Sequence, residues 1–184
     1  PTVTDIANLT AGIVRRVWAT PVTLVGHSLG SAVAVRAAQQ LDGQCHAIVS
    51  IEGNLTAHDA FLTGQAASHD DPAEFKASLA AQIDTLVAAG EAPASLAESV
   101  RAADAATMWA LGRDVALQSR DDRFGHEFVQ LTCPSLYLWS RATTPQPSQD
   151  FLRAHAVPHH ELGIAHHWPW IVDPAVVAVL ITGL

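Results

Sequence analysis

The feature that most constrains this chain is a serine that stands between two glycines, where one hydrophobic pattern gives way to another. Before it, residues 21–25 form a short apolar run rich in β-branched side chains, which predicts a buried strand. The run breaks into Gly-His-Ser-Leu-Gly around Ser28, and residues 31–38 follow with the composition of a helix. Together these segments predict a very tight turn from strand to helix, with Ser28 at its apex.

The geometry of such a turn suggests its chemistry. Gly26 and Gly30 have no Cβ, so we expect the strand and the helix to approach each other at these glycines. The side chain of Ser28 would stand clear of the backbone, where it can act as a nucleophile. The start of the helix directs free N–H groups at an anion forming over Ser28, and the backbone N–H of Leu29 is the expected oxyanion-hole donor.

Further apolar runs predict three more strands, at residues 47–51, 133–139 and 157–162. Strands that alternate with helical patterns predict an α/β fold with a parallel sheet and helices on both faces. Groups that carry chemistry gather at the carboxyl ends of such strands. We also expect an N-terminal helix that is capped by Thr4 or Asp5. Its expected apolar face comprises Ile6, Leu9, Ile13, Val14 and Val17.

The pattern changes in the middle of the chain, where helices are predicted and strands are not. One helix starts at Asp71-Pro72, and another starts at Pro93 and continues through Leu111. The chain therefore divides into three segments. These are a core segment with the serine turn at 1–54, a helical segment at 55–127 and a C-terminal core segment at 128–184.

The strand, the Gly-His-Ser-Leu-Gly turn around Ser28 and the helix after it resemble the α/β-hydrolase family. The resemblance extends over nearly the whole chain, and it implies a catalytic triad in the order serine, acid, histidine. It also implies that the helical segment is a cap over the active site. Phe61, Met108 and Trp109 would then wall an acyl pocket, and His27 would face the substrate or pack beside the nucleophile.

The base of such a triad takes the proton of the serine and is itself held by a carboxylate. Among ten histidines we expect His167 to be this base. It follows the last predicted strand and precedes Trp168, Pro169 and a final helix, an order similar to that of the family. His166 is the alternative, because the register of this loop is open by one residue.

The acid is not where most members of the family place it. The loop after the third predicted strand, residues 140–149, contains no Asp or Glu, and Asp150 follows it in the next helix. We prefer Glu52, because it ends the buried run 47–51, where an unpaired charge would be costly. Some relatives carry their acid at that strand. Asn54, two residues further on, could form a hydrogen bond near the site or cap the next helix, and we expect the cap.

The chain begins at Pro1 directly in a helical pattern. The family places several strands before the serine turn, together with a loop that supplies the second oxyanion donor. Either the chain is a fragment of a longer protein or the missing half arrives as another chain, and we expect a fragment. The strand at 22–25 would have an open apolar edge that favours self-association. With a single oxyanion donor, weak activity is expected from this chain alone.

The resulting hypothesis is a serine hydrolase that cleaves a small-molecule ester, thioester or lactone through an acyl-enzyme. Acyl transfer, C–C bond hydrolysis and cofactor-free haloperoxidase activity use the same triad and stay open. A non-catalytic binding module of the same fold also stays open. A serine rather than an aspartate at position 28 argues against an alkyl-enzyme mechanism.

Composition and motif spacing limit which partners, membranes and cofactors we expect this chain to bind. A net charge of −8 without a basic cluster argues against nucleic acid. The sequence has neither an apolar run long enough to span a bilayer nor a basic leader, so a cytoplasmic protein is expected. His155, His159 and His160 suggest zinc, but Pro158 breaks the helix that they would share. We therefore expect no metal and no cofactor.

Overall fold

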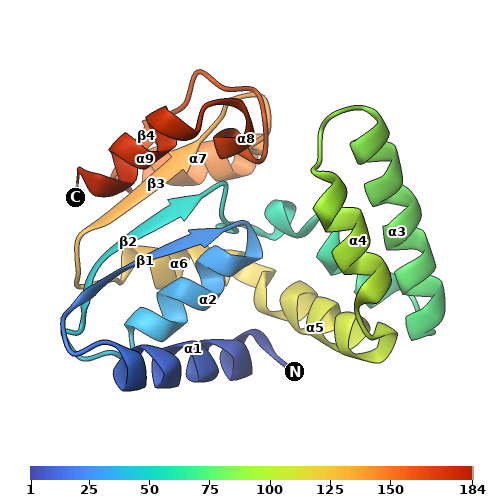
Figure 1. Ribbon diagram of the computed structural model, residues 1–184, viewed down its shortest axis with the longest axis horizontal. Coiled ribbons are helices and arrows are strands. Elements are labelled where there is room, and N and C mark those ends of the chain that lie inside the picture. Colours follow the sequence, from blue (N-terminus) through green and yellow to red (C-terminus); the bar gives the residue numbers. More distant parts are fainter. Residues whose placement is uncertain (184) are drawn as a thin grey trace.

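Four parallel strands form one sheet in the computed structural model, which describes residues 1–183. The order in the sheet is β1-β2-β3-β4, so each strand pairs with the next one along the chain (Figure 1). The predicted α/β class and parallel sheet are confirmed. The strands are β1 (Val22–His27), β2 (Cys45–Ile51), β3 (Ser135–Trp139) and β4 (His159–Glu161).

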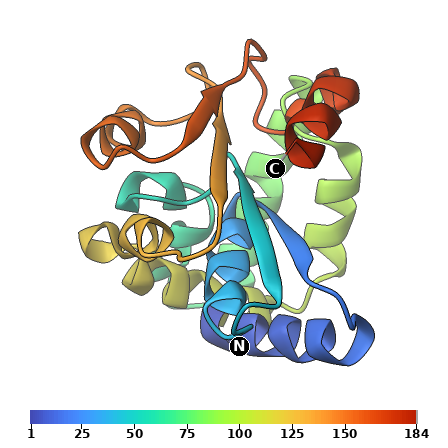
Figure 2. The same ribbon diagram turned by 90° about the vertical axis from the view of Figure 1, so that its left-hand side faces the viewer.

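Helices cover both faces of this sheet, as Figure 2 shows. One face packs against a layer of four helices, in which α1 lies against α2. The other face packs against the C-terminal helices. The first layer consists of α1 (Val3–Val17), α2 (Leu29–Ala38), α6 (Arg123–Val129) and α7 (Gln146–Ala154), and the second of α8 (Pro169–Val172) and α9 (Pro174–Thr182).

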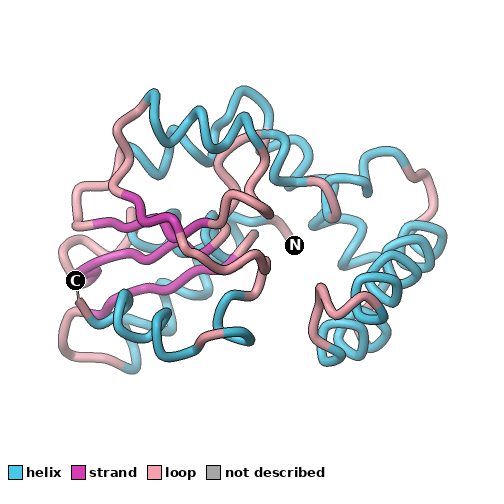
Figure 3. The backbone as a smooth tube through the Cα atoms, turned by 90° about the horizontal axis from the view of Figure 1, so that it is seen from above, coloured by secondary structure: helices cyan, strands magenta, loops and turns pink. Residues whose placement is uncertain are grey.

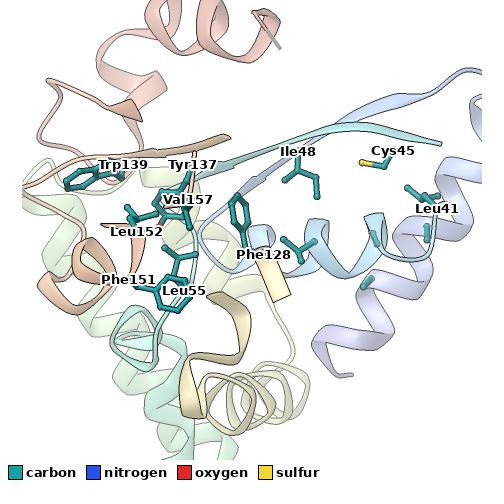
Figure 4. Packing of buried hydrophobic residues seen from close by; sticks show 14 of the residues in the cluster. Leu41, Cys45, Ile48, Leu55, Phe128, Tyr137, Trp139, Phe151, Leu152 and Val157 are labelled. Atoms are coloured by element: carbon teal, nitrogen blue, oxygen red, sulfur yellow. The ribbon is translucent and has the colours of Figure 1, made fainter. Parts of the chain in front are cut away.

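Side chains alternate between the two faces along each strand, because successive residues of a strand point to opposite sides. Ile48 and Tyr137 lie on the face that packs against α6 and α7, where they meet Phe128 and Leu152 (Figure 4). Leu138 lies on the opposite face with the side chains of α9. The sheet is therefore covered on both faces at its two central strands, β2 and β3, which explains why these strands read as continuous apolar runs.

The middle of the chain is helical, as expected, and forms its own apolar cluster around Phe75, Leu79 and Ile83. Its longer helices lie to one side of the sheet, beyond the carboxyl ends of β1 and β2 (Figures 1 and 3). No helix within residues 1–183 has the length and apolar character needed to cross a bilayer. The elements are η1 (Ala57–Ala60), η2 (Thr63–Ser68), α3 (Pro72–Ala88), α4 (Ala94–Ala102), α5 (Ala105–Gln118) and η3 (Arg120–Asp122).

Two local expectations were wrong. The helix predicted from Pro93 through Leu111 is divided into α4 and α5, because the side chain of Asp104 accepts a hydrogen bond from the N–H of Thr107 and starts a new helix. Helix α1 begins after Thr2, whose side chain and that of Asp5 form a capping box.

The expected apolar face of α1 was confirmed at Val14, which is buried, but wrong for most of its other members. The helix buries its small side chains, Ala7 and Ala11, together with Val3 and Val14. Small residues allow α1 to approach α2 closely, and the larger Leu9, Ile13 and Val17 remain exposed. Propensity and periodicity do not distinguish these two faces, because the packing partner decides between them.

The turn from β1 to α2 leaves no room for a side chain at one of its glycines. A Cβ built on Gly26 would lie 2.5 Å from Ser31 Cα and 2.6 Å from Gly30 O, so strand and helix are in backbone contact there. A Cβ on Gly30 would meet no atom within 4 Å. The backbones of the strand and the helix therefore approach each other at Gly26 and Gly30, as expected, but only Gly26 must lack a Cβ for this contact.

These two glycines give a matched pair of substitutions. We expect Gly26→Ala to lower the free energy of unfolding by about 1–3 kcal/mol or more, because the clash is with backbone atoms that cannot move aside cheaply. Gly30→Ala should leave the stability unchanged or raise it by up to about 1 kcal/mol, because alanine favours a helix. Urea unfolding measures both changes, and equal effects of the two substitutions would contradict this packing.

Strand β1 pairs only with β2 among the described residues, and Val25 on this strand is 46% exposed. An unpaired strand edge with exposed apolar side chains can pair with another chain. We expect a second copy to associate at this edge at high protein concentration, and Val25→Lys to weaken the association. Light scattering over a concentration series measures this, and a monomer at every concentration would exclude it.

Candidate active site

Ser28 lies in the turn that joins β1 to α2, with a backbone conformation of φ 52° and ψ −129°. Such a conformation costs a non-glycine residue about 1–3 kcal/mol and persists only where the surrounding structure enforces it. The N–H of Ser28 donates to Ile51 O at 3.0 Å, which ties the turn to the end of β2. Leu29 is the first residue of α2, so its N–H has no acceptor within the helix.

Glu52 follows β2 directly and is buried, with only 6% of its surface exposed. Its Oε1 accepts a hydrogen bond from the N–H of Ser140 at 2.6 Å, and its Oε2 accepts one from Thr144 Oγ1 at 3.3 Å. Both partners belong to the loop after β3. The carboxylate is therefore satisfied by this loop, and within residues 1–183 no arginine pairs with it.

His167 lies in the loop after β4, with Nδ1 3.5 Å from Oε2 of Glu52. Its side chain is 18% exposed, against 2% for that of Glu52, so the imidazole lies between the buried carboxylate and a more open space. The ring meets Trp168 edge-on, with centroids 4.8 Å apart. A distance of 3.5 Å is longer than an ordinary N–H···O hydrogen bond.

His27 holds the backbone of this loop. Its Nε2–H donates to the carbonyl oxygen of His167 at 2.8 Å, and its ring packs edge-on against Trp170 at 4.6 Å. Burial, followed by the nearby His167, lowers the pKa of His27 to about 4. The imidazole of His27 is therefore neutral near pH 7, and it acts on the loop as a hydrogen-bond donor.

The two alternatives left open by the sequence lie elsewhere. Asp150 is exposed on α7, where it accepts hydrogen bonds from Arg153 at 2.6 Å and Gln146 at 3.0 Å. His166 accepts a hydrogen bond from the N–H of Trp168 at Nδ1, and its Nε2 lies 3.3 Å from Gly90 O. Neither residue lines the cavity that contains Ser28.

That cavity has a volume of about 310 Å³, and its lining residues come from the carboxyl ends of β1 and β2, the loop after β4 and the helical segment. Ser28, His27 and His167 line it together, so the structure brings the serine and the histidine to one space. Most of the remaining lining is apolar. It comprises Phe61, Leu62, Phe75, Leu79, Ile83, Leu96, Val100, Met108, Leu111 and Trp168, with Gly112 and the more polar Asn54, Asp59 and Thr63.

Phe61 and Met108 therefore lie where the sequence suggested, but Trp109 does not. Its Nε1–H donates to His69 O at 2.8 Å, and Arg113 stacks over its ring at 4.7 Å. The next residue along a helix points about 100° away from the one before it, and Trp109 points toward His69 while Met108 lines the cavity.

The expected role of Asn54 as a helix cap was also wrong. Helix η1 is capped by Thr56, in a capping box with Asp59, and Asn54 lines the cavity instead. Sequence reasoning also missed Ser140 and Thr144 as partners of Glu52. A signal for Ser140 was present, because it follows β3 as directly as Glu52 follows β2.

Comparisons with known proteins agree with this architecture. Residues 1–180 match the profile of the alpha/beta hydrolase family. This chain belongs to the alpha/beta hydrolase family. A search of the curated proteins found no match.

Solved structures of hydrolases share the fold of this family member. A hydrolase from Oleispira antarctica is 11% identical over all of this chain and 73% of its own, with a TM-score of 0.73. E-2-(acetamidomethylene)succinate hydrolase is 21% identical, over 99% of this chain and 73% of its own, with a TM-score of 0.67. A thermophilic esterase from Thermogutta terrifontis is 16% identical, over all of this chain and 71% of its own, with a TM-score of 0.66.

The lowered pKa of His27 gives this hydrolase-family protein a pH-dependent stability. Between about pH 6.5 and pH 4, His27 is protonated in the unfolded chain but neutral in the folded protein. The free energy of unfolding therefore falls as the pH falls through this window. The loss is at most about 3 kcal/mol. Urea unfolding at several pH values should show a smaller acid-side loss in His27→Gln than in the wild type. Equal slopes would contradict the burial of a neutral His27.

Proposed function

We propose that this chain is a serine hydrolase that cleaves an ester, thioester or lactone through an acyl-enzyme. Ser28 is the nucleophile, His167 the general base and Glu52 the acid that orients it. The observation that supports the proposal most directly is the approach of His167 to the buried carboxylate of Glu52, at the wall of a cavity that also contains Ser28. A nucleophile, a base and an orienting carboxylate are the parts that such chemistry needs.

In this mechanism His167 Nε2 takes the proton of Ser28 as Oγ attacks the carbonyl carbon of the substrate. Glu52 accepts a hydrogen bond from Nδ1–H, which fixes the tautomer and stabilises the imidazolium. The N–H of Leu29 donates to the oxyanion. The leaving alcohol or thiol receives the proton from His167, and a water molecule, activated by the same histidine, then releases the acid and restores Ser28.

The helical segment 55–127 acts as a cap in this proposal. It supplies most of the apolar wall of the cavity, including Phe61 from the loop before η2 and Met108 from α5. The acyl part of a small-molecule substrate would occupy this space, because burial of an apolar chain against such a wall is favourable. With the Leu29 N–H as the assigned oxyanion donor, we expect slow turnover, since one donor is typically worth about 10²–10³ in rate.

A fluorophosphonate probe tests the assignment, because it reacts only with an activated serine. We expect the probe to label the wild type and not Ser28→Ala. Glu52→Gln should slow labelling by about 10²–10⁴-fold, because the imidazole loses its orienting charge. Asp150→Asn is the matched control, and it should react at the wild-type rate because Asp150 is exposed and bonded elsewhere. Mass spectrometry of the labelled protein over time gives the rates.

An unlabelled wild-type protein would contradict the enzyme assignment and favour a non-catalytic binding module. If Glu52→Gln and Asp150→Asn slow labelling equally, the role of Glu52 as the orienting acid is contradicted, but the role of Ser28 as the nucleophile is not.

A further inference from the structure

We propose that Asn54 is the specificity residue of this cavity, and that the preferred substrate carries a neutral hydrogen-bonding group, an amide or a hydroxyl, on its acyl chain. This inference rests on the proposed function and deepens it. It starts from one observation that the triad does not use. Asn54 is only 5% exposed and lines the same cavity as Ser28, yet within residues 1–183 its carboxamide makes no hydrogen bond.

The loop around Asn54 explains why its side chain is free. The backbone N–H groups that follow Asn54 are hydrogen-bonded to Asp59 and not to Asn54. Asp59 Oδ2 accepts hydrogen bonds from the N–H groups of Leu55 at 2.8 Å and Thr56 at 2.7 Å. Ser148 Oγ also donates to Asp59 Oδ2, at 2.8 Å. Asp59 therefore holds the loop in place, and Asn54 is not needed for this task.

An unbonded carboxamide in this place needs a partner. Buried polar side chains are almost always hydrogen-bonded, to protein or to water. Before a substrate binds, water can serve as the hydrogen-bond partner of the carboxamide. When an acyl chain fills the cavity and displaces the water, a carboxamide left without a partner costs about 1–3 kcal/mol. A purely alkyl chain would impose this cost, and a chain that carries a hydrogen-bonding group would avoid it.

The chemistry of the wall limits what that group can be. A carboxamide offers two N–H donors and one carbonyl acceptor, so it matches an amide or a hydroxyl equally well. Asp59 lies on the same wall, and its carboxylate disfavours a second anion nearby. The rest of the lining is mostly apolar, so a charged group of either sign would lose more hydration free energy there than an amide or a hydroxyl would. The substrate class is therefore an ester or thioester with an apolar acyl chain interrupted by one uncharged polar group.

Two pairs of esters with matched skeletons test this assignment. The first pair is para-nitrophenyl N-acetylglycinate and para-nitrophenyl isocaproate, which place an amide or only hydrocarbon in the same shape. The second pair, N-acetyl-β-alaninate and isoheptanoate, moves the amide one carbon further along. For each pair we define the selectivity as the ratio of kcat/KM for the amide ester over the alkyl ester, with each value divided by its rate of spontaneous hydrolysis.

We expect the wild type to favour the amide ester of at least one pair, and Asn54→Leu to reduce that selectivity by roughly 5- to 150-fold, the effect of one buried hydrogen bond. Leucine matches asparagine in size and cannot bond the amide. Asn54→Ala guards against a folding defect of the first variant, and both variants are checked by thermal unfolding. Thr63→Val changes another polar residue of the same cavity and should preserve the selectivity.

Selectivity that is unchanged in Asn54→Leu and Asn54→Ala would overturn the proposal, as would a loss in Thr63→Val alone. Binding separates this failure from failure of the proposed function. In Ser28→Ala, calorimetry with the methyl esters of the same acids should show tighter binding of the amide member, and Asn54→Leu in that background should remove the difference. This difference in binding is expected even if the wild type hydrolyses none of the esters. If the calorimetry shows no difference, the proposed role of Asn54 is contradicted.

Discussion

The buried carboxylate of Glu52 is the group on which the organisation of this site depends. A charge removed from water costs several kcal/mol unless other groups satisfy it. Its partners come from two separate loops, Ser140 and Thr144 after β3 and His167 after β4. The need to satisfy one carboxylate therefore fixes the position of both loops relative to the end of β2. The base of the proposed triad is placed by the same interactions.

Strain at the strand ends is the second constraint. Ser28 and Glu52 both adopt positive φ, 52° and 48°, at the ends of neighbouring strands. Tight packing beneath them enforces these conformations. Ser31 Oγ donates to Gly26 O at 2.9 Å and accepts a hydrogen bond from Ser50 Oγ at 2.9 Å, so one buried serine of α2 joins both strands. The strain is offset by this packing, and it turns the side chains of both proposed triad members out of the sheet.

Local features of this fold could be predicted from the sequence. The strand, turn and helix around Ser28 follow from a few adjacent residues. The position of Glu52 at the end of a strand follows from the apolar run directly before it. The remaining features depend on tertiary contacts. Which face of α1 is buried depends on the fit of Ala7 and Ala11 against α2, which periodicity does not encode. The same holds for Trp109, which bonds His69, and for Asn54, which lines the cavity because Thr56 caps the next helix.

The proposed mechanism requires Ser28 to attack the substrate, His167 to take the proton of Ser28, and Glu52 to orient the imidazole of His167. A crystal structure of the chain after reaction with a fluorophosphonate tests it most directly. We expect a covalent bond from phosphorus to Ser28 Oγ, with His167 Nε2 within about 3.2 Å of an oxygen on phosphorus and Nδ1 still directed at Glu52. An adduct in which the imidazole of His167 lies out of reach of phosphorus, or has turned away from Glu52, would contradict it.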